Sequence, residues 1–298
     1  MRNYLFRINN TNRVWVIMTL LLLSISSTIS CQDKTKDISK DPFLLYYLRN
    51  YPTIKIDNSK NVMIQYISYR DFDKKDIIYG DSERGTFWYS IYLFQNRVFS
   101  GIDRATTNNG RLLWRYKEIE INRDADGAIY SIDQYAIGQN RLLWRHTYKK
   151  NNNTIVANDG LRSGVIFAVL VEEESKYLFY EDHRMYNRTP DKPETTIEFI
   201  DNGDVIITSY NPLLQRDYSR FYFTNGILMK REYIGDRTET YTVSSGIGEI
   251  VITNTAGAVI ERRMLERRIN DAGYLEYEAV KYPSGPGHEY FITKDTLK

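Results

Sequence analysis

The sequence predicts an all-β protein, a repetitive antiparallel meander of β-hairpins in an open or curled sheet with a short N-terminal helix. The first observation is composition: 25 Tyr, 12 Phe and 4 Trp stand against 7 Pro, a balance that favours strands. The second is a repeated phrase, because Arg111-Leu112-Leu113-Trp114-Arg115 returns as Arg141-Leu142-Leu143-Trp144-Arg145. The third is a series of Gly-containing turns, which supply the positive φ angles of tight hairpins.

The predicted domain, residues 41–298, begins with a helix. Asp41 is a suitable N-cap and Pro42 fits the first helical position. Asn50 and Pro52 end the segment. The apolar stripe between these signals consists of Phe43, Leu44, Tyr47 and Leu48.

Stretches rich in β-branched and aromatic residues predict the strands that follow. Before the middle of the chain these are Val62–Tyr69, Thr86–Phe94, Arg111–Ile121, Ala128–Ile137, Arg141–Lys149, Gly164–Val171 and Lys176–Tyr180. Later strands are expected at Thr195–Ile200, Asp204–Tyr210, Arg220–Thr224, Ile227–Ile234, Thr238–Val243, Glu249–Thr253, Tyr274–Tyr282 and Glu289–Thr293.

Two segments allow alternatives. Pro190 and Pro193 exclude a central strand, so residues 188–194 form a loop that divides either two subdomains or two parts of one sheet. Residues 258–270 are rich in helix formers. Their bounding turns at Gly257 and Gly273 match the other hairpins, so a strand is favoured over a helix there.

Residues 1–30 have the order of a secretory signal peptide. Arg2, Arg7 and Arg13 precede an apolar run from Val14 to Leu23, and small residues then lead to Cys31. The apolar run is short for a helix that spans a bilayer. Plain secretion and a membrane anchor with an incidental cysteine are the alternatives.

The segment Thr28-Ile29-Ser30-Cys31 resembles the lipobox of bacterial lipoproteins, with Thr28 where leucine is usual. The resemblance implies cleavage after Ser30 and lipid attachment at Cys31, and several acyl chains hold a protein stably on a bilayer. In that family an aspartate after the cysteine signals inner-membrane retention, whereas Gln32 follows here. We therefore expect a lipid-anchored outer-membrane protein, with residues 31–40 as a polar tether.

The hairpin phrases resemble two families of repeats. Phe223-Thr224-Asn225-Gly226-Ile227-Leu228 resembles the MORN-variant repeats of antitoxin-like bacterial lipoproteins. Arg123-Asp124-Ala125-Asp126-Gly127-Ala128-Ile129-Tyr130 resembles the tyrosine-aspartate repeats of Rhs-type shells. Both resemblances imply an open or curled antiparallel sheet that acts as a binding scaffold. Together with the aromatic-rich hairpins and the lipid tether, this predicts a binding module for a protein partner, with an envelope role or neutralisation of an incoming toxin as the two options.

Charge argues against a nucleic-acid partner. Without the three arginines of residues 1–30, 37 of the 40 basic residues remain against 38 acidic ones, so the mature chain lacks a basic excess. No cofactor is indicated. The three histidines, His146, His183 and His288, are too sparse for a His-rich metal centre, and no catalytic constellation is apparent, so we expect a non-enzymatic protein.

A turn and a set of aromatic residues are the candidate binding features. Asn122, Asp124, Asp126 and Asp133 follow the spacing of a calcium loop; the alternating residues on both sides favour a plain hairpin turn instead, with no metal. Trp114 and Trp144 lie at matching positions of the repeated phrase, and Trp88 precedes them. They form either a core ladder or an exposed face that stacks on a sugar or a protein. A glycan-binding or glycan-degrading surface component is therefore the alternative function.

Overall fold

The computed structural model describes residues 40–79, 86–109, 111–139, 141–151, 154–159, 166–173, 175–181, 192–200, 202–211 and 216–297. The predicted signal peptide, Cys31 and most of the predicted tether lie outside these ranges. Among the described residues, no helix has the length and apolar character needed to cross a membrane.

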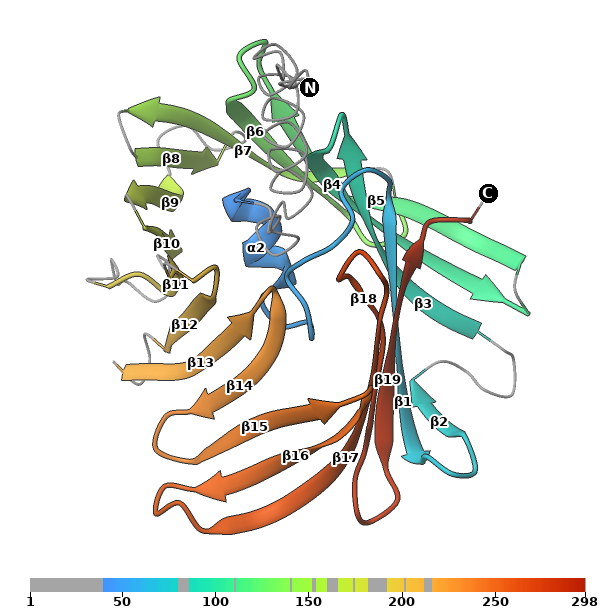
Figure 1. Ribbon diagram of the computed structural model, residues 1–298. Coiled ribbons are helices and arrows are strands. Elements are labelled where there is room, and N and C mark those ends of the chain that lie inside the picture. The colour runs from blue at the N-terminus through green and yellow to red at the C-terminus, as the bar shows by residue number, and fades with distance from the viewer. Residues whose placement is uncertain are drawn as a thin grey trace, which may run out of the picture. The chain divides into compact units, whose positions relative to one another are not determined.

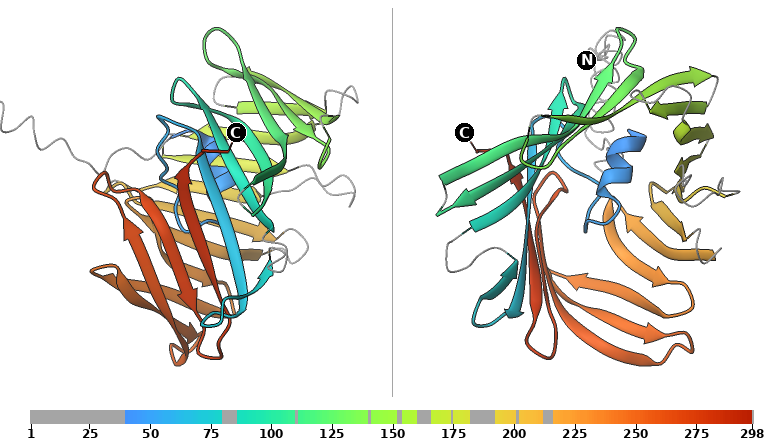
Figure 2. Two further views of the ribbon diagram at one scale, coloured as in Figure 1. Left: turned by 90° about the vertical axis from the view of Figure 1, so that its right-hand side faces the viewer. Right: turned by 180° about the vertical axis from the view of Figure 1, so that it is seen from behind.

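The fold is an antiparallel β meander with a short N-terminal helix, as the sequence predicts. Each strand from β3 to β19 pairs antiparallel with the next strand along the chain. Strand β1 pairs with β19 along one edge and with β3 and β2 along the other. The sheet curls, and α2 lies on its inner side (Figures 1 and 2).

The strands of the first half are β1 (Val62–Asp71), β2 (Asp76–Tyr79), β3 (Thr86–Gln95), β4 (Val98–Asn108), β5 (Arg111–Arg123), β6 (Ile129–Tyr135), β7 (Leu142–Asn151), β8 (Thr154–Asp159), β9 (Ile166–Glu173) and β10 (Lys176–Glu181). Those of the second half are β11 (Thr195–Phe199), β12 (Val205–Asn211), β13 (Arg216–Thr224), β14 (Ile227–Tyr233), β15 (Arg237–Ser244), β16 (Ile247–Asn254), β17 (Val259–Ile269), β18 (Leu275–Lys281) and β19 (Gly287–Lys294).

Helix α2 (Pro42–Leu48) forms where the capping signals predict it. The backbone of Asp41 is extended, and its Oδ1 accepts hydrogen bonds from the amides of Phe43 and Leu44 at 3.0 and 3.1 Å. Its Oδ2 contacts Arg123 Nη2 of β5 at 2.6 Å. These contacts satisfy helix N–H groups that have no partner within the helix and join the helix to the sheet.

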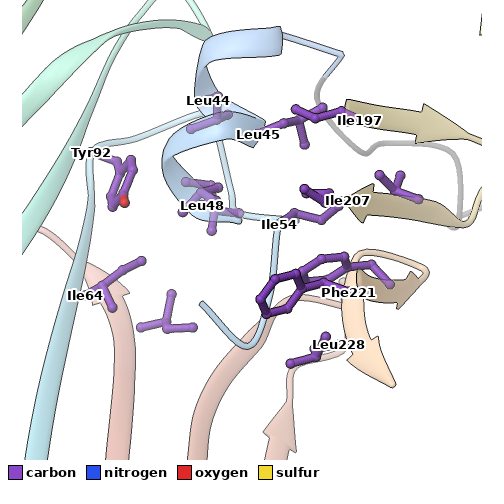
Figure 3. Close-up of a cluster of buried hydrophobic side chains, with 14 of the residues drawn as sticks. Leu44, Leu45, Leu48, Ile54, Ile64, Tyr92, Ile197, Ile207, Phe221 and Leu228 are labelled. Carbon is purple, nitrogen blue, oxygen red and sulfur yellow. The ribbon is translucent and has the colours of Figure 1, made fainter. Parts of the chain in front are cut away.

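The core lies between α2 and the inner face of the sheet. Leu45 and Leu48 have no exposed surface, and they point toward apolar side chains of strands distant in sequence, such as Ile197 of β11 and Ile207 of β12 (Figure 3). Burying apolar side chains stabilises the fold by roughly 1.5–3 kcal/mol for each large residue. A seven-residue helix depends on this packing, because isolated helices so short are unstable in water.

The segment after α2 is held to β14 by backbone contacts at a turn. Ile54 N donates to Gly226 O at 2.8 Å, and Thr53 Oγ1 donates to the same carbonyl oxygen at 2.9 Å. Gly226 has a φ of 79°, and a Cβ there would overlap the side chain of Lys55. Glycine is therefore required for both the turn and this close approach.

Three strands, β2, β4 and β8, are not among those predicted from the sequence. Strand β4 contains Gly101, Asp103 and Arg104, which weaken a strand signal based on β-branched and aromatic residues. Tertiary contacts override this composition, because Arg104 pairs with Glu118 across the strands at 2.7 Å. Within residues 258–270 the structure has strand β17 (Val259–Ile269), which confirms the strand over the helix.

The proposed division at residues 188–194 is only partly visible. Residues 188–191 lie outside the described residues. The strands on the two sides, β10 and β11, pair antiparallel with each other. Within the described residues, one sheet therefore continues across this point.

Candidate functional site

A polar cavity of about 300 Å³ lies on the inner face of the sheet. Strands β14–β19 and β1 form its walls, and Asn50 and Pro52, just after α2, complete its lining. We call this cavity the Arg–Tyr pocket. Its charged and titratable lining residues are Arg231, Arg237, Glu239, Arg263, Glu278 and His288, and its tyrosines are Tyr66, Tyr233, Tyr241, Tyr282 and Tyr290.

Strand alternation and register bring these side chains together. Arg231 of β14 lies opposite Glu239 of β15, and Glu278 of β18 lies opposite Tyr290 of β19. Because side chains alternate between the two faces of a strand, every second residue of these strands faces the cavity. The pocket thus combines residues from positions 50 to 290 of the chain.

Glu239 is the acidic centre of the pocket. Its side chain is only 4% exposed, and its carboxylate lies 3.7 Å from Arg231, 3.5 Å from Arg237 and 3.6 Å from Arg263. Tyr241 Oη donates a hydrogen bond to it at 3.2 Å. One carboxylate is therefore shared among three guanidinium groups.

A second buried ion pair lies beside this cluster. Arg267 Nε donates to Glu278 Oε2 at 2.7 Å, and the two side chains are 2% and 4% exposed. Burial raises the pKa of Glu278, although the positive charges of Arg267 and Arg231 oppose that shift. Removing one partner of such a pair leaves an uncompensated group in the interior.

Tyrosine rings orient the guanidinium groups. The Arg263 guanidinium stacks on Tyr282 at 4.2 Å from the ring centre, and that of Arg237 stacks on Tyr233 at 4.4 Å. The edges of both guanidinium planes face carboxylates: Arg263 Nε and Nη2 donate to Glu261 at 2.9 and 3.0 Å, and Arg237 Nη1 donates to Asp236 at 2.9 Å. Stacking and these pairs together fix both arginines at the cavity wall.

His288 reports the electrostatic character of the cavity. Burial, together with the positive charges of Arg231 and Arg263, lowers the pKa of His288 to about 4. The imidazole is therefore neutral near pH 7. A group that changes protonation near the working pH is the usual general acid or base, and His288 does not meet that condition.

The structure brings together two of the three predicted tryptophans. Trp88 of β3 and Trp114 of β5 both lie opposite Thr106 of the intervening strand β4. Their rings meet edge to face with centres 5.7 Å apart, and the ring centre of Tyr116 is 5.2 Å from that of Trp114. We call Trp88, Trp114 and Tyr116 the tryptophan ledge.

The ledge is partly accessible to solvent. Trp88 is 56% exposed, so it is not a core residue, whereas Tyr116 is 8% exposed. Trp144 lies in β7 opposite Gln134, but its side chain is outside the described residues. The exposed tryptophan keeps the glycan-binding alternative open.

The predicted calcium positions form a hairpin turn between β5 and β6. Asp124 Oδ1 accepts hydrogen bonds from the amides of Asp126 and Ala128 at 3.0 and 2.9 Å. Asp133, 1% exposed, is paired with Arg145 at 2.6 Å, and Asn122 Nδ2 lies 3.4 Å from the same carboxylate. Across the described ranges, no group of three or more His, Cys, Asp or Glu side chains is arranged to hold a metal ion.

The sequence predictions missed the Arg–Tyr pocket. Its residues are spread over β14–β19 and β1 with no common motif. Arg and Glu at alternate positions of the strands are the available signal, as in Arg237 and Glu239. That pattern also describes an ordinary solvated face, so it does not distinguish a pocket.

Comparisons with known proteins leave the family of this chain open. No family model matches it, and no curated protein matches it, so the MORN-variant and tyrosine-aspartate resemblances stay predictions. Among solved structures it is similar to a porin-like protein from Bacteroides uniformis, with 7% identity and a TM-score of 0.25. That match covers 79% of this chain and 97% of the other. At this TM-score the likeness carries no argument about function.

Proposed function

We propose that this protein is a non-enzymatic binding module, held at the outer membrane by a lipid on Cys31, that takes up its partner on the inner face of the sheet. The Arg–Tyr pocket is the observation that carries the proposal. Its walls are strands paired on both sides, so the backbone holds the lining side chains in fixed positions, a feature of precise binding sites.

The chemistry of the pocket supports binding over catalysis. His288 is neutral near pH 7 because its pKa is lowered to about 4, and Glu239 is surrounded by arginines. Glu278 is held by Arg267. These groups are committed to each other, which favours recognition over proton transfer.

The location rests on the sequence. A basic region, a short apolar run and small residues lead to the only cysteine of the chain. This order supports a lipid anchor on Cys31. Labelling cells with an alkyne fatty acid and fractionating their membranes tests it: the wild-type protein is expected to carry label in the outer membrane and Cys31→Ser to carry none. Unlabelled wild-type protein would contradict the anchor.

Access to the pocket provides the test of the binding function. Asn50 is exposed at the lining of the cavity, so Asn50→Trp places a large ring there and Asn50→Ala serves as the matched control. Full-length protein in detergent is tested on a carbohydrate array and against isolated candidate partner proteins. A ligand bound by wild type and Asn50→Ala but lost in Asn50→Trp is expected. Equal binding by all three forms would exclude the inner face as the binding site.

Glycan binding at the tryptophan ledge is the second candidate, favoured by the 56% exposure of Trp88. Exposed aromatic rings stack on sugars through their apolar faces. Trp88→Ala is expected to lose carbohydrate-array binding, whereas Ile247→Ala, which removes an exposed apolar side chain elsewhere, keeps it. Array binding that survives Trp88→Ala would count against this candidate.

A further inference from the structure

The carboxylates near the pocket do not balance its arginines in the buried region. Arg263 also pairs with Glu261 at 2.9 Å and Arg237 with Asp236 at 2.9 Å. The side chains of Glu261, Arg237 and Asp236 are 33%, 35% and 65% exposed, so solvent screens all three. Arg231 and Arg263, 22% and 14% exposed, are screened less. Among these carboxylates, Glu239 is the buried one, and it faces three guanidinium groups.

Guanidinium N–H groups in this region lack an acceptor. Within the described part of the chain, Nε of Arg231 and Nη2 of Arg267 are buried without a hydrogen-bond partner, and Nε of Arg237 makes no hydrogen bond but faces Glu239 at 3.5 Å. Buried donors are nearly always paired in native proteins. An acceptor supplied by a ligand in the cavity would pair Nε of Arg231, a lining residue.

The lowered pKa of His288 supports the same conclusion. Besides burial, the positive charges of Arg231 and Arg263 lower this pKa, so the potential at this side of the cavity is positive. An anion placed there is stabilised, because charges interact more strongly where water is excluded. Geometry and electrostatics therefore both favour a negatively charged ligand.

The remaining lining specifies the kind of anion. Glu239 and Glu278 also face the cavity, so the positive excess is small and suits one negative charge better than two. Arginine binds a planar carboxylate through paired N–H groups. Burial raises the pKa of Tyr282 and Tyr290, so their phenols stay protonated and can donate hydrogen bonds to hydroxyl groups.

The size of the cavity sets a limit on the ligand. A volume of about 300 Å³ lies at the lower end of the range for ligand sites. We propose, on the basis of the binding function proposed above, that the Arg–Tyr pocket binds a small polyhydroxylated monocarboxylate, a sugar acid of monosaccharide size.

Calorimetry with D-glucuronate on the full-length protein in detergent tests this inference. D-glucose is the neutral counterpart, and glucose 6-phosphate is the counterpart with a second negative charge. Glucuronate is expected to bind. Glucose is expected to bind at least about tenfold more weakly because it lacks the charged acceptor, and a hydrogen bond to a charged group contributes roughly 1.5–3 kcal/mol. Glucose 6-phosphate is also expected to bind at least about tenfold more weakly, because the small positive excess of the pocket suits one negative charge better than two.

Two arginines, one inside the pocket and one on the exposed face, provide the matched variants. Arg231 lines the pocket and its Nε lacks an acceptor, whereas Arg262 pairs with Glu249 on the exposed face. Arg231→Met is expected to weaken glucuronate binding roughly 10- to 100-fold, and Arg262→Met is expected to change it less than about twofold. Because Arg231→Met could disturb folding, the NMR signal of His288 in the wild type is followed as well, and glucuronate is expected to shift it.

Three results would overturn the inference. One is the lack of glucuronate binding at roughly 10 mM, where even a millimolar site is mostly filled. The others are equal binding of glucose or glucose 6-phosphate, and glucuronate binding that leaves the His288 signal unchanged. If one of these results is obtained but Asn50→Trp abolishes the binding of a different ligand, the sugar-acid inference fails and the proposed binding function stands. If Asn50→Trp abolishes the binding of no ligand, the proposed function fails.

Discussion

Two parts of the same inner face differ in how their space is filled. Next to α2, apolar side chains of β11, β12 and β13 pack against the helix, and Leu48 has no exposed surface (Figure 3). Along β14–β19, arginines, glutamates and tyrosines line a cavity. The sheet is continuous through both parts, so the choice of inward-facing residues decides whether the space becomes core or pocket.

This comparison separates stability from binding. A fully apolar lining would be expected to collapse onto a second covering element, because burial of apolar surface stabilises the fold. Buried ion pairs contribute little net stability compared with apolar residues of similar volume. The polar lining is therefore understood better as a feature for recognition than as a source of stability.

The largest expected effect concerns the buried pair of the polar part. Arg267→Met leaves Glu278 without its partner, which is expected to lower the free energy of unfolding by roughly 3–5 kcal/mol. The double variant Arg267→Met/Glu278→Leu is expected to recover most of the loss. Urea unfolding followed by circular dichroism measures both. A double variant as unstable as the single one would show that the pair is essential to folding.

The second prediction concerns the apolar part. Leu48→Ala opens a cavity between the helix and the sheet and is expected to cost roughly 2–5 kcal/mol. Leu113, 56% exposed, provides the control, since Leu113→Ala at an exposed position is expected to cost less than about 0.5 kcal/mol. Equal urea midpoints for the two variants would show that α2 contributes no packing energy.

The third prediction uses pH to separate the two parts. The folded-state pKa of His288, about 4, lies below its ordinary value of 6.5. As pH falls below 6.5, the unfolded chain takes up a proton that the folded chain does not, so the contribution of His288 to stability is present above pH 6.5 and lost between about pH 6.5 and 4. The loss between pH 7 and 5 is on the order of 1–2 kcal/mol.

NMR titration of His288 checks this directly. Arg231→Met removes one of the positive charges that lower its pKa, so the pKa is expected to rise in that variant. Leu48→Ala, in the apolar part, serves as the control and is expected to leave the pKa where it is. A wild-type pKa near 6.5 would mean that the pocket is neither dry nor positive.

The smallest expected effect lies at the start of α2. Asp41→Ala removes the hydrogen bonds to the amides of Phe43 and Leu44 and the contact with Arg123, at a cost of about 1 kcal/mol. Asp41→Asn keeps an acceptor for the amides and is expected to be less unstable. If both variants unfold at the same urea concentration, the ion pair with Arg123, rather than the cap, joins the helix to the sheet.

Local signals predicted much of the fold. The N-cap Asp41 with Pro42 located the helix, and stretches of β-branched and aromatic residues located most strands. The bounding turns at Gly257 and Gly273 located β17 despite its helix formers. Strand β4 escaped because Gly101 and Arg104 give no local β signal. It forms by pairing with β3 and β5, its neighbours in sequence, and these cross-strand contacts cannot be read from the propensities of its own residues.

Of the two candidate binding sites, one was indicated by the sequence and the other was not. The repeated phrase made Trp114 a candidate binding residue, and the structure places Trp88 beside it, two strands away. The Arg–Tyr pocket had no such phrase. Local patterns indicate that Arg237 and Glu239 share a face, but they do not indicate which face is inside.

The sequence by itself determined the alternation of side chains, the positions of most turns and the helix cap. These properties depend on neighbours within a few residues. Only the tertiary structure decided that Arg231, Glu239 and His288 meet in one cavity. Their meeting depends on strand register and on the curl of the sheet, which arise from contacts between residues far apart in the chain.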